Sequence, residues 1–392
     1  MAQETRHAEI AGAGLAGLFA GAALAQRGWS VRIHERSEDL RMFGAGIWLW
    51  ENGLTSLEAL GVLDEAVRDG AHITAWTVID HRDQVIRRRD AGPTDRLIVP
   101  PRADLYEALI GAVQRAGAEI VTGSVVDSAD PSGVLTLADG SSHRADLVIA
   151  ADGLRSKIRE ALGLTQSYTK LGNGAIRMLI PRLPDENFHT SREYWSGHRV
   201  LLYNPCGPDW VYLCLVCPVD DARGRAVPLD KASWAEAFPM IADVVARVES
   251  QGRWDDFDTV TATRWSAGRV AIIGDASHGQ PPWLGQAANL AFANALAMSE
   301  FVTYSPDVTT GLVAWERACR PLTDHTERWT NRYGHVVGVW PESAQAIRSL
   351  ALKAFVATPG VERMLNRPQH TQVIGTERLT PRRAAAGVQQ AY

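Results

Sequence analysis

The chain has 392 residues, of which 46% are hydrophobic and 22% charged, as in a globular protein that buries one large core or two interleaved ones. Its 40 Lys and Arg residues oppose 45 Asp and Glu residues, so the formal net charge is -5. Apart from the short run Arg87–Arg89 no block of like charge stands out, which argues against a nucleic-acid partner.

The N-terminal segment has neither the pattern of a signal peptide nor that of a membrane span. Residues Met1–His7 are polar, and the apolar stretch Ile10–Leu24 is short and contains four glycines. We therefore expect a cytoplasmic protein that does not associate with membranes.

The first elements form a βαβ unit. A short strand over 8–11 precedes a helix over 15–27, Gly28 ends that helix, and residues 29–35 alternate as a second strand. This unit has about the minimum length that such a motif needs.

Further elements follow in chain order. Residues 54–63 have helical spacing, 73–87 alternate like strands, and 102–116 form an amphipathic helix. Residues 119–126 and 133–137 are predicted strands. Residues 145–151 form a nearly unbroken apolar run, which is typical of a buried parallel strand.

The second half changes character and then returns to the first pattern. Residues 163–265 are rich in strands, whereas 268–275 form a strand that leads through a turn into a long helix over 287–302. We predict an α/β fold: a Rossmann-like domain from 1–162 and 266–392, with a helical C-terminal part, and an inserted, mostly antiparallel substrate layer from 163–265. The polar end from Arg367 is predicted to be a loosely held tail.

The four cysteines do not predict a metal or redox site. Cys214 and Cys217 are three residues apart within a predicted strand, so their side chains should point to opposite faces. We therefore expect no metal ion in this protein.

A dinucleotide motif occupies the turn of the βαβ unit. Gly12-Ala-Gly14-Leu-Ala-Gly17 matches G-x-G-x-x-G, with a strand before it, a helix after it and Glu35 at the end of the second strand. Gly12 permits the tight turn, Gly14 lets the backbone approach a pyrophosphate, and Gly17 allows close packing of helix and strand. Glu35 would accept hydrogen bonds from ribose hydroxyls. These residues leave open whether the dinucleotide is NAD or FAD.

Two later segments decide between them. Asp146-Leu-Val-Ile-Ala-Ala-Asp-Gly-Leu-Arg-Ser156 and Arg269-Val-Ala-Ile-Ile-Gly-Asp-Ala-Ser-His278 resemble the "DG" and "GD" motifs of the single-component flavoprotein aromatic hydroxylases, typified by para-hydroxybenzoate hydroxylase. The segment Phe43–Gly53 and, more weakly, Ala314–Arg317 are most similar to the pyridine-ring oxygenases of that family, such as 2-methyl-3-hydroxypyridine-5-carboxylic acid oxygenase.

The resemblance implies FAD as the cofactor and assigns roles to several residues. Arg102 and its helix would cover the ribityl and phosphate region, Asp275 would hold the ribityl or pyrophosphate side, and Asp152 and Gly153 would lie near the same groove. Further candidates for cofactor binding are Arg36, Val126, Gly285 and Ala287. Two positions depart from the family pattern, since Glu51 replaces the usual Pro before Asn52 and Ala287 replaces the last Gly of Gly-Gln-Gly.

The resemblance also implies the reaction. NADH or NADPH would reduce the flavin and leave, because the chain has no second G-x-G-x-x-G. O2 would then form a C4a-hydroperoxyflavin that hydroxylates a small hydroxylated aromatic or N-heteroaromatic ring; whether the ring also opens stays undecided. Pro282, at the start of the long helix, fits the family's proline beside the flavin ring, and that helix N-terminus would face the N1-C2=O edge.

Candidate substrate contacts lie in the strand-rich layer. Arg177 is inside an apolar strand, so it pairs with a buried carboxylate or faces the cavity. Tyr203 and Tyr212 are candidates to hydrogen-bond a ring substituent, although tyrosines in strands more often pack across strands. For His278 a structural role is favoured over a catalytic one, and no base for substrate deprotonation is evident. The candidates to line an aromatic slot are Trp48, Trp50 and Trp283.

Two other functions are considered beside the monooxygenase. One is a flavin oxidase or reductase that inserts no oxygen, and the other is a flavin-binding protein without catalysis. The expected partners are a small aromatic substrate and O2, and a homodimer is considered as the assembly.

Overall fold

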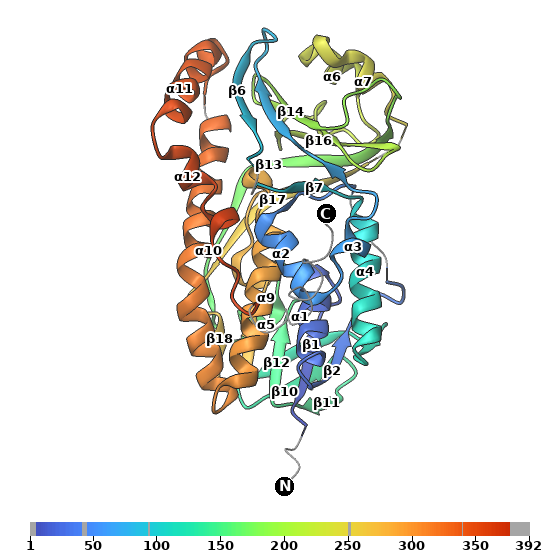
Figure 1. The fold of residues 1–392 in the computed structure, drawn as a ribbon, viewed down its shortest axis with the longest axis vertical. Coiled ribbons are helices and arrows are strands. Elements are labelled where there is room, and N and C mark those ends of the chain that lie inside the picture. Colours follow the sequence, from blue (N-terminus) through green and yellow to red (C-terminus); the bar gives the residue numbers. More distant parts are fainter. Residues whose placement is uncertain (1–4, 41–44, 93–94, 250–251, 339, 377–392) are drawn as a thin grey trace, which may run out of the picture.

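The structure is a computed structural model that describes residues 5–40, 45–92, 95–249, 252–338 and 340–376. Phe43 and Gly44 of the Phe43–Gly53 segment and residues 377–392 lie outside the described residues. The sequence predicts a loosely held tail from Arg367, but Arg367–His370 form a 3-10 turn in which Pro368 and Gln369 are buried. Figure 1 shows two layers, a lower one around a mostly parallel sheet and an upper one around a larger sheet. The predicted α/β fold with an additional, mostly antiparallel layer is confirmed.

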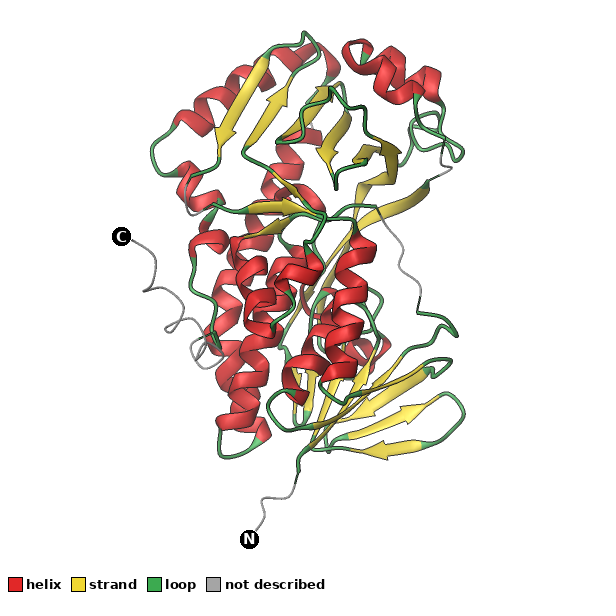
Figure 2. Cartoon of the chain, turned by 45° about the vertical axis from the view of Figure 1, so that its right-hand side comes forward, coloured by secondary structure: helices red, strands yellow, loops and turns green. Residues whose placement is uncertain are grey.

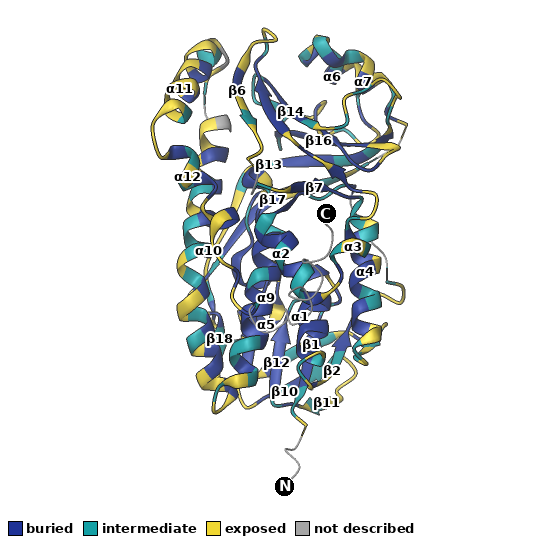
Figure 3. Ribbon diagram, in the orientation of Figure 1, coloured by how far each residue is buried: buried dark blue, intermediate teal, exposed yellow. Residues whose placement is uncertain are grey.

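The lower sheet is six-stranded and parallel except at one edge. Its strands β12 and β19 are apolar along their whole length, and Leu147–Ala150 is completely buried (Figure 3) because helices and a small sheet cover the two faces of the sheet. In spatial order its strands are β18 (Ser266–Ala267), β19 (Val270–Ile272), β12 (Leu147–Ala150), β1 (His7–Ala11), β2 (Ser30–His34) and β8 (Glu119–Val121).

Helices gather on one side of the lower sheet, and a three-stranded meander lies on the other side (Figure 2). The helices of this layer are α1 (Leu15–Ala25), α2 (Glu51–Leu60), α3 (Leu63–Ala66), α4 (Arg102–Arg115), α5 (Lys157–Ala161), α8 (Asp275–His278), α9 (Ala287–Tyr304) and the long α10 (Val308–Gly338). The meander consists of β9 (Val126–Asp130), β10 (Val134–Leu137) and β11 (Ser142–Arg144).

The upper sheet is seven-stranded. In spatial order it contains β17 (Arg253–Ala262), β13 (Thr165–Pro181), β16 (Trp210–Pro218), β15 (Arg199–Pro205), β14 (Thr190–Ser196), β5 (Ala75–Ile79) and β6 (Val85–Asp90). Strand β5 pairs in parallel with β14, so this layer also takes residues 75–90. The predicted substrate layer, residues 163–265, therefore has to be extended to include the β5–β6 hairpin.

Short elements complete the two layers. A small sheet of β3 (Leu49–Trp50), β7 (Leu97–Val99) and β4 (Ala71–His72) lies between them. Helices α6 (Lys231–Ala237) and α7 (Ala242–Ala246) cover the outer face of the upper sheet, where Trp234 and Phe238 are fully buried. Helices α11 (Gln345–Ala357) and α12 (Val361–Leu365) lie beside β6.

No helix among the described residues combines the length and the apolar character that crossing a bilayer requires.

A buried acid ties β1 to β2 in the lower sheet. Glu9 is 1% exposed and accepts hydrogen bonds from Nε2 of His34 at 2.7 Å and Nε2 of His7 at 2.9 Å. Burial alone would raise the pKa of Glu9, but the two histidine hydrogen bonds outweigh it and hold the pKa below its ordinary value.

We predict that Glu9→Gln lowers the free energy of unfolding by about 1–3 kcal/mol near neutral pH. A carboxyl group with a lowered folded-state pKa stabilises the fold above its unfolded pKa, and this contribution is lost as the pH falls through the folded pKa. Urea denaturation of wild type and variant at neutral pH and at about pH 4 measures the difference, which should shrink on acidification. An undiminished difference at acid pH would contradict this account.

Candidate active site

The glycine turn between β1 and α1 leaves room for a ligand only at its middle glycine. A Cβ on Gly12 would lie 2.5 Å from the carbonyl oxygen of Ala151, and one on Gly17 would lie 2.0 Å from that of Gly12. A Cβ on Gly14, which caps α1, would meet no atom within 4 Å. Gly12 and Gly17 thus permit close backbone packing, whereas the space at Gly14 adjoins the free N–H groups of α1.

Glu35 follows β2 and lies beside this turn. Its Oε2 accepts a hydrogen bond from the backbone N–H of Ala13 at 3.0 Å, and its Oε1 accepts one from that of Ser37 at 3.0 Å. Arg36 is exposed, and Val126 begins β9 and is half-buried. None of these three residues lines the cavity described next.

One cavity of about 450 Å³ extends from the glycine turn to the upper sheet. At the lower end it is lined by Gly14, Gly153 and Asp275, and at the upper end by Arg177, Tyr212 and Glu193. The predicted cofactor motifs and the predicted substrate layer therefore face a single space.

Unsatisfied polar groups border this space. Nε of Arg102, which lines the cavity, is buried and has no hydrogen-bond partner among the described residues. The same holds for Oδ1 of Asp152, which does not itself line the cavity but precedes the lining residue Gly153. Burial raises the pKa of Asp152 and also that of Asp275, for which the nearby positive charge of Arg102 acts in the opposite direction. Asp275 lies deep within the protein, and the exposed part of its side chain faces the cavity. Buried groups without partners are uncommon, and here they indicate a place for a polar ligand.

The N-terminus of α9 forms one corner of the cavity. Pro282 starts a 3-10 turn over Pro282–Leu284, and Gly285 follows in the left-handed conformation with φ 61°. Gly285 and Ala287 both line the cavity. Nε2 of Gln286 is buried without a partner, and the N–H groups of the first turn of α9 lie beside it.

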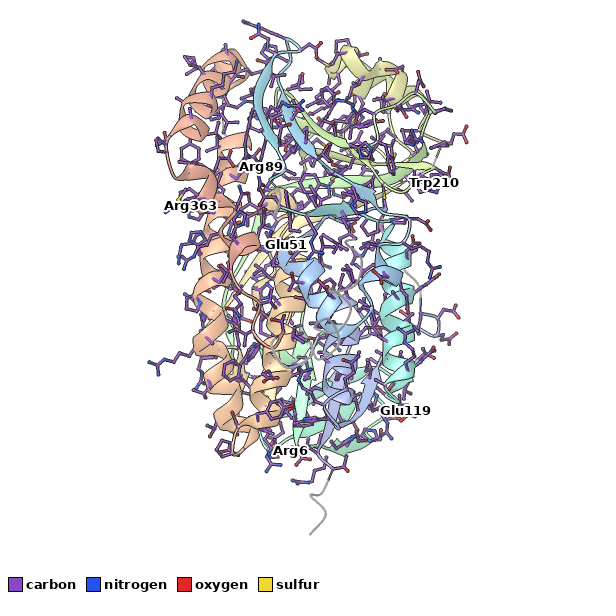
Figure 4. All side chains as sticks on the ribbon, viewed as in Figure 1. Arg6, Glu51, Arg89, Glu119, Trp210 and Arg363 are labelled. Carbon is purple, nitrogen blue, oxygen red and sulfur yellow. The ribbon has the colours of Figure 1, made fainter. Side chains whose placement is uncertain are left out.

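Glu51, which departs from the family pattern, has a structural partner. It begins α2 at the level where the two layers meet (Figure 4) and forms an ion pair with Arg96 at 2.6 Å. Its charge is therefore engaged outside the cavity lining.

Of the predicted substrate contacts, Arg177 and Tyr212 line the cavity and Tyr203 does not. Of the two alternatives Arg177 meets the second: it faces the cavity, whereas its ion-pair partner Asp255, at 3.4 Å, is partly exposed and not a buried carboxylate. Arg177 also hydrogen-bonds to the side chain of Tyr212. Tyr203 packs instead on the outer face with Leu213 and under Arg192, because side chains alternate along β15 and the neighbouring Leu202 takes the cavity side.

The tryptophans and His278 are placed as follows. Trp48 and Trp283 line the cavity together with Trp76, which the sequence did not single out, whereas Trp50 lies behind Trp48 at 5.6 Å between ring centroids. His278 is buried outside the cavity, and burial lowers its pKa to about 4, in keeping with the favoured structural role.

The cysteines have the geometry expected for a strand. Cys214 packs with the cavity-side cluster and Cys217 with the cluster on the outer face. The two thiols therefore cannot approach each other to form one site.

Glu193 is a cavity residue that was not among the candidates predicted from the sequence. It lies on β14, is 2% exposed and lines the cavity among aromatic side chains. The available signal was the alternation Ser191, Glu193, Trp195, which puts a carboxylate on the same face of a strand as two residues that are completely buried.

Taken together, these residues fit FAD. The open space at Gly14 and the N-terminus of α1 suit the pyrophosphate, Arg102 and Asp275 can hydrogen-bond the ribityl region, and the Pro282 corner can receive the ring. The unpartnered Nε of Arg102, a residue that lines the cavity, is the observation that indicates such a polar occupant.

We predict that Gly14→Val weakens FAD binding roughly 10- to 100-fold while the apoprotein stays folded. The added side chain would enter the ligand space without meeting protein atoms, whereas Gly12→Val would collide with the backbone of Ala151. Flavin titration and thermal unfolding of the apoproteins separate the two effects. Equal flavin affinity in Gly14→Val and wild type would contradict the placement.

Comparisons with known proteins agree with this geometry. The family model described as FAD binding domain matches residues 5–301. The 2-heptyl-3-hydroxy-4(1H)-quinolone synthase of Mycobacteroides abscessus is 38% identical over 344 residues, which cover 86% of this chain and 92% of the relative. The 6-hydroxynicotinate 3-monooxygenase of Bordetella bronchiseptica is 28% identical over 312 residues, which cover 74% and 81%.

A solved structure matches over nearly the whole chain. The crystal structure of an alanine mutant of 2-methyl-3-hydroxypyridine-5-carboxylic acid oxygenase has a TM-score of 0.84 and 33% identity, covering 96% of this chain and 98% of that one. A structure described as the tetrameric form of the same oxygenase has a TM-score of 0.83 and 34% identity, covering 95% and 99%. The chain belongs to the FAD binding domain family, and its resemblance to the flavoprotein aromatic hydroxylases is confirmed.

Proposed function

We propose that this flavoprotein monooxygenase hydroxylates a small hydroxylated aromatic ring, in particular an N-heteroaromatic one, with O2 and NAD(P)H. The observation that carries the proposal is the single cavity, which joins the glycine turn and Asp275 to an aromatic wall in the upper sheet. A ring placed against that wall would lie next to the position where the cofactor's ring ends.

The names of the relatives support the choice of substrate class. They refer to a pyridinecarboxylic acid, a hydroxynicotinate and a quinolone, all of which contain nitrogen in an aromatic ring and carry a ring oxygen. The experiment below determines which ring is the substrate, which position is hydroxylated and whether the ring opens.

Bound FAD would supply the activation of O2, and the protein would supply position, charge and dryness. The N–H groups of α1 would hold the pyrophosphate beside Gly14, and Arg102 would lie over the ribityl chain. The first turn of α9, behind Pro282, would place its positive end at the N1-C2=O edge of the ring. Trp48, Trp76 and Trp283 would exclude water from the reacting atoms.

Arg177 is the proposed contact for a negatively charged substituent. It faces the cavity, and its hydrogen bond to Asp255, at 3.4 Å, is long. A carboxylate or ionised ring oxygen would therefore find an available guanidinium donor there.

The nicotinamide donor would bind transiently, since the sequence has one G-x-G-x-x-G motif. The protein would act in the cytoplasm, and it would form a homo-oligomer, for which the tetrameric form of the pyridine-ring oxygenase is the precedent.

The deciding experiment measures NAD(P)H oxidation, O2 uptake and product formation by the FAD-loaded protein with 3-hydroxypyridines, 6-hydroxynicotinate, 2-alkyl-4(1H)-quinolones and 4-hydroxybenzoate. We expect at least one N-heteroaromatic compound to give about one hydroxylated product per O2. Hydrogen peroxide without product from every compound would instead identify an oxidase. A protein that binds FAD but oxidises no NAD(P)H with any compound would overturn the proposed reaction.

We predict that Arg177→Met raises KM for carboxylated or anionic ring substrates roughly 10- to 100-fold, because a hydrogen bond to a charged group is lost. Neutral substrates should be affected less. Arg192→Met is the matched control, since Arg192 stacks on Tyr203 on the outer face of the same sheet. Equal effects of the two substitutions on KM would contradict the role of Arg177.

A further inference from the structure

Glu193 lines the cavity from strand β14 of the upper sheet. Directly paired residues on neighbouring strands form a row across the upper sheet, and side chains in such a row share one face. In spatial order the row is Arg177, Cys214, Leu202, Glu193, Val78 and Arg87. Glu193 is thus the carboxylate of this row and lies three strands away from Arg177.

The contacts of Glu193 leave one oxygen available. Oε1 accepts a hydrogen bond from Nε1 of Trp195 at 2.6 Å and a longer one from the hydroxyl of Tyr333 at 3.4 Å. No described residue donates a hydrogen bond to Oε2, and the residue lines the cavity. The carboxyl group is therefore held through one oxygen and can accept from a ligand through the other.

Tyr333 connects Glu193 to the corner where the cofactor's ring would end. Its hydroxyl reaches Glu193, and its ring lies 6.4 Å from that of Trp283, the residue next to Pro282. Trp76 and Leu202 line the same part of the cavity. A substrate ring between this corner and β14 could present a hydroxyl group to Oε2.

The surroundings of Glu193 make its proton exchangeable near neutral pH. Burial raises the pKa of Glu193 to about 7, against the opposing effects of the hydrogen bond from Trp195, the charge of Arg87 and the hydroxyl of Tyr333. The titratable or charged groups that face it are Arg87 on β6, Tyr333 on α10 and Cys214 on β16. Two short hydrogen bonds tie Arg87 to Glu362, at 2.9 and 2.6 Å, so Arg87 does not pair closely with Glu193.

In the described part of the chain, three other carboxylates line the cavity, and their contacts differ from those of Glu193. Asp275 lies at the cofactor end near Arg102, and Asp256 accepts a hydrogen bond from Nε1 of Trp254 at 2.8 Å. Asp258 accepts one from the hydroxyl of Tyr168 through Oδ2, and its Oδ1 is buried without a partner among the described residues. Among the described residues that line the cavity, Glu193 is the acid set in the aromatic wall.

We propose that Glu193 is the catalytic base that takes the proton from the ring hydroxyl of the substrate, an inference that rests on the proposed function. The ring O–H bond breaks, its proton binds Oε2 of Glu193, and the electron pair stays on the ring oxygen, which makes the ring a better nucleophile. After hydroxylation the attacked carbon loses its hydrogen as a proton, and the ring oxygen recovers a proton from Glu193. No oxidant or reductant is needed for this transfer.

The first test is the pH dependence of kcat/KM in the FAD-loaded enzyme, with the compound from the panel that is hydroxylated. Wild type should rise through an acid limb near pH 7. Glu193→Gln should lose this limb and about 10²- to 10⁴-fold of kcat/KM at high pH. Trp195→Phe and Tyr333→Phe each remove a donor that stabilises the carboxylate, so both should move the limb to higher pH. A limb that persists in Glu193→Gln overturns the proposal.

The matched control is Glu186→Gln, because Glu186 is a partly buried acid of the same layer that pairs with Arg247 outside the cavity. Its acid limb should coincide with that of wild type. A purely structural role of Glu193 would lower thermal stability in Glu193→Gln and leave the shape of its pH profile unchanged.

The second test needs no turnover and separates this inference from the proposed function. The probe is 3-nitrophenol, a weaker acid than 4-nitrophenol whose anion also absorbs visible light, added to FAD-loaded protein without NAD(P)H at a pH just above the acid limb of wild type, where Glu193 is ionised and the free probe is mostly neutral. Wild type should bind it as the anion and Glu193→Gln as the neutral phenol. Binding of the same form to both proteins overturns the role of Glu193. If wild type ionises the probe but hydroxylates no panel compound, the proposed reaction is wrong, whereas the role of Glu193 as a proton acceptor is supported.

Discussion

The constraint on which the rest of the structure depends is the close approach of three backbone segments at the glycine turn. Neither Gly12 nor Gly17 has room for a Cβ, because Ala151 and Gly12 themselves occupy that space. This contact fixes the N-terminus of α1 over the ends of β1 and β12. The segments after β12 and β19, which carry Asp152 and Asp275, therefore meet the N–H groups of α1 at one edge of the lower sheet.

The upper sheet turns this edge into a closed site. It places a continuous wall of side chains from Arg177 to Trp76 opposite the glycine turn, and the first turn of α9 forms the corner between them. Arg102 in the cavity lining, Asp152 after β12 and Gln286 at the N-terminus of α9 keep buried polar atoms without partners among the described residues. Such groups destabilise an empty site, so a ligand that satisfies them should stabilise the fold as it binds.

The sequence predicted what depends on local pattern. The βαβ unit, the apolar strand at Leu147–Ala150 and the helix that begins at Ala287 follow from periodicity and glycine position. The pairing of strands that are distant in the sequence could not be predicted from local patterns. No pattern near residues 75–90 indicates that β5 pairs with β14. The face of the upper sheet on which Tyr203 lies depends on the register of β15. The alternation of side chains in the sequence does not decide between the two faces. Glu193 was missed because its hydroxyl partner, Tyr333, comes from a helix 140 residues further along the chain.

The most direct measurement of the central claim is a crystal structure of the FAD-loaded protein. The account predicts the pyrophosphate beside Gly14, the ribityl chain between Arg102 and Asp275, and the flavin ring at the Pro282 corner facing Arg177, Tyr212 and Glu193. A flavin whose ring lies outside the cavity, or whose phosphates avoid the N-terminus of α1, would contradict it.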